Sequence, residues 1–154
     1  MPKISRILVP IDFSEYSKKT FLYAIDFAKT FNAELLLVYV VEPIIYPADF
    51  GFGQVALPSM EKDMHERGRE QLDILVEKEV PEGVYARAIV RAGKPFVEII
   101  QAAKDEKADL IIIATHGHSG IEHVLFGSTA EKVIRKSSCP VLSIRSSERD
   151  FVMP

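Results

Sequence analysis

The sequence contains a single cysteine, Cys139, so the chain cannot form an internal disulfide. This usage is typical of the reducing cytoplasm, where disulfides are rare. No run of apolar residues approaches the ~18 that a membrane-spanning helix needs. Residues 1–12 also lack the small-residue cleavage site of a signal peptide. We therefore expect a cytoplasmic protein that has no membrane partner.

The sequence also lacks an excess of charge of one sign. Lysine and arginine together number 19 and aspartate and glutamate 22, which gives a formal net charge of -3 at pH 7. Proteins that bind nucleic acid through a broad surface are basic, because they neutralise phosphates. We therefore expect no nucleic-acid partner.

Apolar residues, in contrast, are plentiful enough for one hydrophobic core. They make up 47% of the 154 residues, and charged residues make up 27%, a balance typical of globular proteins. A chain of this length suits one domain, so we predict a single domain over residues 1–154.

Five short apolar runs alternate with four longer amphipathic stretches. The apolar runs are predicted strands, at residues 4–10, 35–41, 84–90, 110–114 and 140–145. The amphipathic stretches are predicted helices, at residues 14–31, 60–78, 96–105 and 128–136. Strands alternating with helices imply parallel units with right-handed crossovers. We therefore predict a Rossmann-like α/β fold of three layers. Its open, parallel, five-stranded sheet has the strand order 3-2-1-4-5 and carries helices on both faces.

Two side chains could cap the first predicted helix, because Asp12 and Ser14 both offer an oxygen to its first backbone N–H groups. The apolar face of this helix is predicted to consist of five residues: Phe21, Leu22, Ile25, Ala28 and Phe31. The connection over residues 42–59 is long for such a fold and rich in apolar residues. We expect it to pack over a ligand pocket or against an adjoining subunit.

The segment ATHGHSGIEHVLFGSTAE, residues 114–131, follows a predicted buried strand and opens a helix. Gly127 allows a ligand to approach the main chain closely, and Ser128 lies where the first helical N–H groups form an anion site. The segment is neither a P-loop nor a dinucleotide fingerprint. Ser128 and Glu131 also have the spacing of a capping box, and a capped turn needs no ligand. The histidines of this segment favour a polyphosphate neighbourhood over a metal site, since no cysteine or carboxylate pair completes a ligand set.

Three separated stretches of the chain resemble the universal stress protein family. They are ILVPIDFSEYS near the start, GKPFVEIIQAAKDEKADLIIIATHG in the middle and GSTAEKVIRKSSCPVLSIR near the end. ATP-binding members of this family carry the motif G-x2-G-x9-G-[S/T] after the fourth strand, and residues 114–128 match its spacing. Ala114 stands where the motif has its first glycine. An alanine is harmless if this position acts through its backbone, but it costs on the order of 1 kcal/mol if a positive φ is required.

The resemblance implies an ATP-binding module of stress response and regulation, which could also hold ADP or AMP together with Mg²⁺ or Mn²⁺. The site residues that it implies are Pro10, Ile11, Asp12, Val40, Ala114, Thr115, His116, Gly117, His118, Ser119, Gly120, Gly127, Ser128, Thr129 and Ala130. The predicted topology agrees, because ligands of open α/β sheets bind at the carboxyl ends of strands where the strand order reverses. Asp12 and Ala114 stand at the carboxyl ends of the two strands on either side of that point.

No side chain is placed as a general base, so we predict no catalytic residue and at most slow ATP hydrolysis. Adenylyl-transfer enzymes of related fold carry an SGG-type loop or an HIGH sequence, and this chain has neither. A phospho-accepting receiver domain needs an aspartate at the end of the third strand, where this chain has residues 90–92, Val-Arg-Ala. The open alternative is a nucleotide-free scaffold of the same family.

The predicted strand over residues 140–145 lies at one end of the sheet and is apolar. An apolar edge strand exposes unpaired backbone groups and invites pairing with another chain. A homodimer through this strand satisfies both edges with one self-complementary surface, and the family resemblance implies the same dimer.

Overall fold

The computed structural model describes residues 2–43, 57–116 and 127–145, with the side chains of residues 57–59 left aside. Its sheet has five parallel strands in the order β3-β2-β1-β4-β5, as predicted from the sequence. The strands are β1 (Arg6–Pro10), β2 (Glu34–Val41), β3 (Ala86–Ala92), β4 (Leu110–Ala114) and β5 (Val141–Ile144). The helices are α1 (Glu15–Phe31), α2 (Leu57–Glu79), α3 (Pro95–Asp105) and α4 (Ser128–Lys136).

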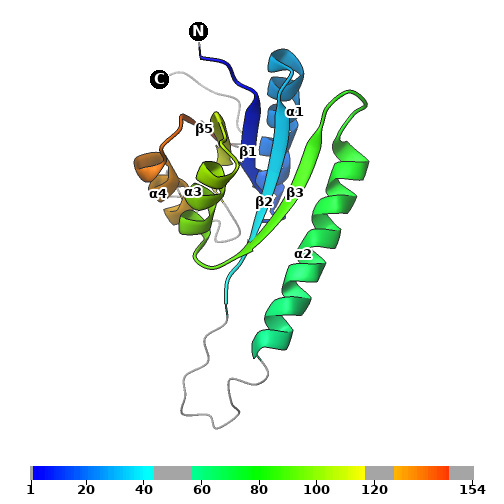
Figure 1. Ribbon diagram of the computed structural model, residues 1–154, viewed down its shortest axis with the longest axis vertical. Helices are drawn as coiled ribbons and strands as arrows, with labels where there is room; N and C mark the ends of the chain where they lie inside the picture. Colours follow the sequence, from blue (N-terminus) through cyan, green and yellow to red (C-terminus); the bar gives the residue numbers. More distant parts are fainter. Residues whose placement is uncertain (1, 44–56, 117–126, 146–154) are drawn as a thin grey trace.

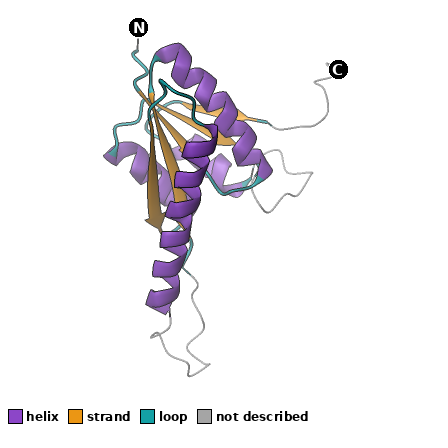
Figure 2. Ribbon diagram, turned by 90° about the vertical axis from the view of Figure 1, so that its right-hand side faces the viewer, coloured by secondary structure: helices purple, strands orange, loops and turns teal. Residues whose placement is uncertain are grey.

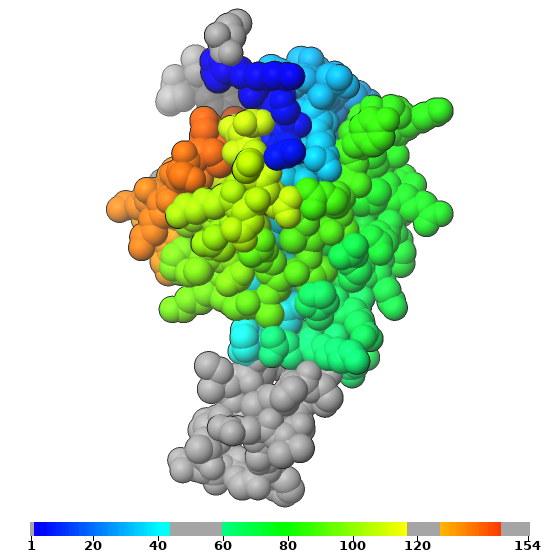
Figure 3. Space-filling view, viewed as in Figure 1, coloured from blue at the N-terminus to red at the C-terminus, as the bar shows by residue number. Residues whose placement is uncertain are grey.

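The sheet separates two helical layers, with α1 and α2 on one face and α3 and α4 on the other (Figures 1 and 2). Alternate residues of each strand point to opposite faces, so Leu35 and Leu37 pack under the first layer while Leu36 and Val38 pack under the second. All four of these side chains are buried, as expected for a parallel sheet that is covered on both faces. The atoms of α3 and α4 meet over the face seen in Figure 3.

The start of α1 decides between the two predicted capping residues. Ser14 is the N-cap, and its Oγ accepts a hydrogen bond from the Ser17 N–H at 3.2 Å. Asp12 lies two residues before Ser14, and its Oδ1 accepts hydrogen bonds from the Ser14 N–H at 2.9 Å and from the Ser14 hydroxyl at 2.5 Å. The side chain of Asp12 is therefore held near the end of β1 by Ser14, the N-cap of α1.

The predicted apolar face of α1 is only partly right. Phe21, Ile25 and Ala28 are buried, whereas Leu22 is 51% exposed and Phe31 44% exposed. Leu22 lies beside the core stripe rather than on it, because each residue of a helix turns by about 100°. Phe31 ends the helix where the chain turns away at Asn32, and it packs beside the ring of Phe27 instead.

Ion pairs fix the last turn of α3 to the edge of the sheet. Arg87 donates to Glu106 at 2.5 Å and to Glu34 at 3.3 Å, and Arg91 donates to Asp105 at 2.8 Å. The hydrogen bond from Arg87 holds the pKa of Glu106 below its ordinary value. For Asp105 the hydrogen bond from Gln101 lowers the pKa most, followed by the one from Arg91. This network sets the position of α3, whose first turn faces the cavity described next.

Within the part of the chain that the structure describes, no helix combines the length and the apolar character that crossing a membrane requires.

Candidate functional site

The main candidate site is a cavity of about 810 Å³ at the carboxyl edge of the sheet. β1 lies between β2 and β4, so the strands that follow β1 in sequence are placed first on one side of it, as β2 and β3, and then on the other, as β4 and β5. The ends of β1 and β4, Pro10 and Ala114, both line the cavity. The cavity therefore lies at the switch point of the topology, where open α/β sheets bind their ligands.

Every predicted site residue that the structure describes lines this cavity. They are Pro10, Ile11, Asp12, Val40, Ala114, Thr115, His116, Gly127, Ser128, Thr129 and Ala130. The other four, over residues 117–120, lie outside the described residues, as does most of the connection over residues 42–59 that was expected to cover a pocket or a subunit surface.

The turn between β4 and α4 is closed by the main chain. The Thr115 N–H donates to the carbonyl of Ile144 in β5 at 3.1 Å, and the Thr115 carbonyl accepts from the Gly127 N–H at 2.6 Å. A Cβ atom on Gly127 would lie 3.1 Å from that carbonyl oxygen. Gly127 has φ -59°, so glycine serves close approach of the backbone here and not a positive φ, and a larger residue would require the backbone to shift by a few tenths of an ångström.

The capping-box interpretation of Ser128 and Glu131 is wrong. Gly127 is the N-cap of α4 and Ser128 is its first residue, and no side chain caps the helix. The helix begins one residue earlier than the box requires, because the Gly127 carbonyl already accepts the first intrahelical hydrogen bond, from the Glu131 N–H at 3.0 Å. Ser128 and Thr129 line the cavity at the start of α4, and the first N–H groups of this helix have no side-chain cap.

His116 is oriented by two neighbours in the described structure. Its Nδ1 lies 3.0 Å from the hydroxyl of Thr115, and its ring packs against that of Tyr16 with 5.5 Å between the ring centroids. Among the described residues, no three histidine, cysteine, aspartate or glutamate side chains gather as a metal site would require.

Sequence reasoning missed the residues that other elements bring to the cavity. They are Phe13, Ser17, Val38, Tyr39, Glu42, Met64, Gln71, Pro95, Ile99 and Ile113. Glu42 and Pro95 could have been found, since both follow the carboxyl ends of predicted strands. Met64 and Gln71 come from the charged middle of α2, where no local pattern separates them from the solvated face.

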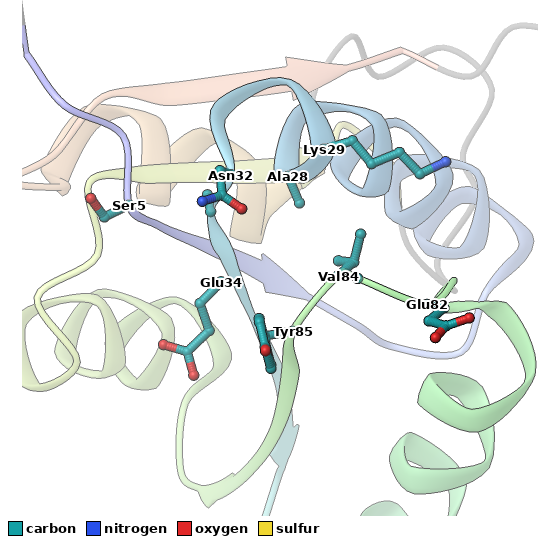
Figure 4. A pocket seen from close by; sticks show the side chains of 10 residues that line it. Ser5, Ala28, Lys29, Asn32, Glu34, Glu82, Val84 and Tyr85 are labelled. Atoms are coloured by element: carbon teal, nitrogen blue, oxygen red, sulfur yellow. The ribbon is translucent and has the colours of Figure 1, made fainter.

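A second cavity, of about 580 Å³, opens at the amino ends of β1, β2 and β3 (Figure 4). Glu34 lines it, but its carboxylate is already paired with Arg6 and Arg87. Lys29 points away from Glu34, so these two charged side chains do not converge on one point. The carboxyl edge is therefore the better candidate site.

Comparison with known proteins agrees with the fold and with the motifs. The sequence pattern of the Universal stress protein family matches residues 3–145. The chain belongs to the universal stress protein family.

Relatives and solved structures of this family cover nearly the whole chain. The chain is 33% identical over 148 residues to the universal stress protein MJ0531 of Methanocaldococcus jannaschii, covering 94% of this chain and 84% of that one. It is similar to the solved structure of MJ0577 of the same organism, with a TM-score of 0.82, 25% identity and coverage of 96% and 99%. A universal stress protein of Archaeoglobus fulgidus in complex with dAMP shares the fold at 18% identity, with a TM-score of 0.58 and coverage of 93% and 98%.

The alanine at the first motif position fits this universal stress protein without strain. Among the described residues other than glycine, only Phe13, Asn32 and Lys107 have a positive φ, so Ala114 does not. It ends β4 in register with Ile144, as any residue of a strand can. The geometry therefore favours the interpretation that this motif position acts through its backbone, and it does not support a requirement for a positive φ.

We therefore expect Ala114→Gly to leave ATP affinity unchanged or to raise it by less than about threefold, with stability falling by no more than about 1 kcal/mol. Titration calorimetry with ATP and magnesium measures the affinity, and urea unfolding measures the stability. A marked loss of affinity would mean that the Ala114 methyl contacts the nucleotide.

Proposed function

We propose that this universal stress protein binds an adenine nucleotide, with ATP as its ligand, and acts as a binding and regulatory module. The observation that carries the proposal is the convergence of Asp12, Ala114 and the start of α4 on one cavity at the switch point. A related structure of the same fold is a complex with dAMP, an adenine nucleotide.

Each part of the nucleotide has a matching wall in the cavity. Val40 and Ile99 supply apolar surface for the base. Asp12 supplies a carboxylate that accepts hydrogen bonds from the adenosine. Gly127 and Ser128 bring the phosphates to the first N–H groups of α4, where the helix dipole favours negative charge.

A divalent cation is expected to accompany the phosphates. The side chains that line the described part of the cavity include two carboxylates, Asp12 and Glu42, and neither lysine nor arginine. The charge of a triphosphate is thus not balanced by described side chains, and Mg²⁺ or Mn²⁺ bound with ATP supplies that counter-charge. The phosphate oxygens themselves are donors that suit such a cation.

Titration of the purified protein with ATP, ADP and AMP, with and without magnesium, tests the proposal. Saturable binding that strengthens with magnesium and with the number of phosphates is the expected result. Mass spectrometry of the natively purified protein should also detect co-purified nucleotide. If no adenine nucleotide binds in the millimolar range, the chain is a nucleotide-free scaffold and the proposal is wrong.

We propose further that the protein is a homodimer paired through β5. β5 is the last strand of the described sheet, with Val141, Leu142 and Ile144 each half-buried. The carbonyls of Pro140 and Ile144 accept from β4, at Ile111 and Thr115. Alternate residues of a parallel strand bond to the same neighbour, so the N–H of Ser143 points to the outer edge.

Ser143→Pro is therefore expected to convert the dimer to a monomer, because it removes an outward N–H without removing a bond to β4. Sedimentation at micromolar concentration should give about 35 kDa for the wild type, twice the chain mass of 17.3 kDa. Ser143→Ala, which keeps the N–H, is the matched control and should remain dimeric. A monomeric wild type, or a folded proline variant that still dimerises, would contradict the β5 dimer.

A further inference from the structure

Phe13, between the end of β1 and the N-cap of α1, has an unusual backbone conformation. Its φ is 62°, in the left-handed region that side chains other than glycine seldom adopt. Phe13 lies between Asp12 and Ser14, which are joined by two hydrogen bonds. Strain of this kind persists only where the surroundings hold it, and it is concentrated at functional sites.

The ring of Phe13 is held by Tyr39 of β2. The two ring centroids lie 5.0 Å apart at an interplanar angle of 52°, a tilted geometry that aromatic pairs favour. Both rings line the cavity. The Ile11 N–H also donates to the Val38 carbonyl at 2.8 Å, so the chain that leads into Phe13 is tied to the same strand.

Tyr39 is in turn held by α2. Gly68 is buried, and a methyl group on it would lie 2.5 Å from Cε1 of Tyr39 and closer still to Cδ1. The ring therefore occupies the space that the missing side chain leaves between helix and strand. Because Met64 and Gln71 of the same helix line the cavity, this contact also sets how closely α2 approaches it.

We propose that Tyr39 is a positioning residue for the nucleotide. Seated against Gly68, its ring holds Phe13 in its left-handed conformation, and Phe13 holds the turn that presents Asp12 to the cavity. The row of Phe13, Tyr39 and Gly68 thereby couples the position of α2 to nucleotide affinity. This inference rests on the proposed function, since Asp12 is taken as a ligand-binding group.

The first experiment is a double-mutant cycle read by calorimetry with ATP and magnesium. Tyr39→Ala should weaken binding about tenfold, whereas Tyr39→Phe, which keeps the ring, should stay within about twofold of the wild type. In an Asp12→Ala background, Tyr39→Ala should add less than about a twofold loss, because the group that it positions is already removed. Tyr85→Ala, at a tyrosine that is 79% exposed and lies at the opposite edge of the sheet, is the aromatic control.

The second experiment needs no ligand. In amide NMR spectra of the free protein, the signals of Asp12 and Ser14 should shift in Tyr39→Ala and in Gly68→Ala. They should stay in place in Tyr39→Phe and Tyr85→Ala. Gly68→Ala combined with Tyr39→Ala should perturb the turn no more than Tyr39→Ala alone, since the added methyl then meets no ring.

The outcomes separate this inference from the proposed function. Unmoved signals at Asp12 and Ser14, or equal losses in the wild-type and Asp12→Ala backgrounds, overturn the positioning role of Tyr39 while ATP binding stands. A wild type that binds no adenine nucleotide overturns the proposed function itself and, with it, the role of Tyr39 in affinity.

Discussion

Replacing Gly127 with valine is expected to abolish ATP binding while the sheet stays folded. Even the first carbon of a side chain at this position would lie 3.1 Å from the Thr115 carbonyl oxygen, and valine adds two methyl groups. The turn would have to shift, and the first N–H groups of α4 would move away from the position proposed for the phosphates. Losing two hydrogen bonds to a charged group costs about 3–6 kcal/mol, which corresponds to a loss in affinity of a hundredfold or more.

Calorimetry with ATP and magnesium measures this loss, and Gly127→Ala gives the graded comparison. The alanine variant meets the same carbonyl with one methyl group only, so its loss should be smaller than that of valine. The urea midpoint of both variants should stay near that of the wild type if the damage is local. An unchanged affinity in Gly127→Val would remove Gly127 from the site.

Phe21→Ala is expected to be the most destabilising substitution in α1. Phe21 is fully buried in the cluster that joins α1 to the sheet, so removing its ring leaves a cavity in a packed core. Such substitutions cost about 3–5 kcal/mol, a large part of the total stability of a small domain.

Tyr23→Ala is the matched control for Phe21→Ala, since it removes a ring from the same helix where the side chain is 55% exposed. Its cost should stay below about 1 kcal/mol. Urea unfolding must be compared at equal protein concentration, because a dimer of the kind proposed above would contribute to the apparent stability. Equal losses in the two variants would mean that the face of α1 towards the sheet is not the one described.

The helices and strands of this fold were predictable because the apolar residues of each follow the period of one type of secondary structure. The strand Leu110–Ala114 and the helix Ser128–Lys136 begin and end as the sequence indicates. β3 runs from Ala86 to Ala92, so it begins and ends two residues later than predicted, because its last residues pair with the end of β2. That pairing is a tertiary contact, so local pattern could not locate the boundary.

The candidate site was predictable to the extent that it follows from topology. Asp12 and Ala114 could be paired from the sequence, because the carboxyl ends of neighbouring parallel strands meet at one edge. The contact of Tyr39 with Gly68 could not be predicted from the sequence, because a glycine within a charged helix indicates only a less stable helix. The spacing of Ser128 and Glu131 fits a capping box, but spacing does not show which carbonyl accepts the first intrahelical bond, and here it is that of Gly127.

The central place of β1 also has a consequence for the order in which the protein can fold during synthesis. β1 is made first, and it pairs with β2 on one side and with β4 on the other. Ile7 finds its second neighbour, Leu110, only after about a hundred further residues have been added. A nascent chain that ends before β4 therefore leaves one edge of β1 unpaired, and such edges promote aggregation. β1 therefore gains its second neighbouring strand when β4 has been made, and not when the first βαβ unit is complete.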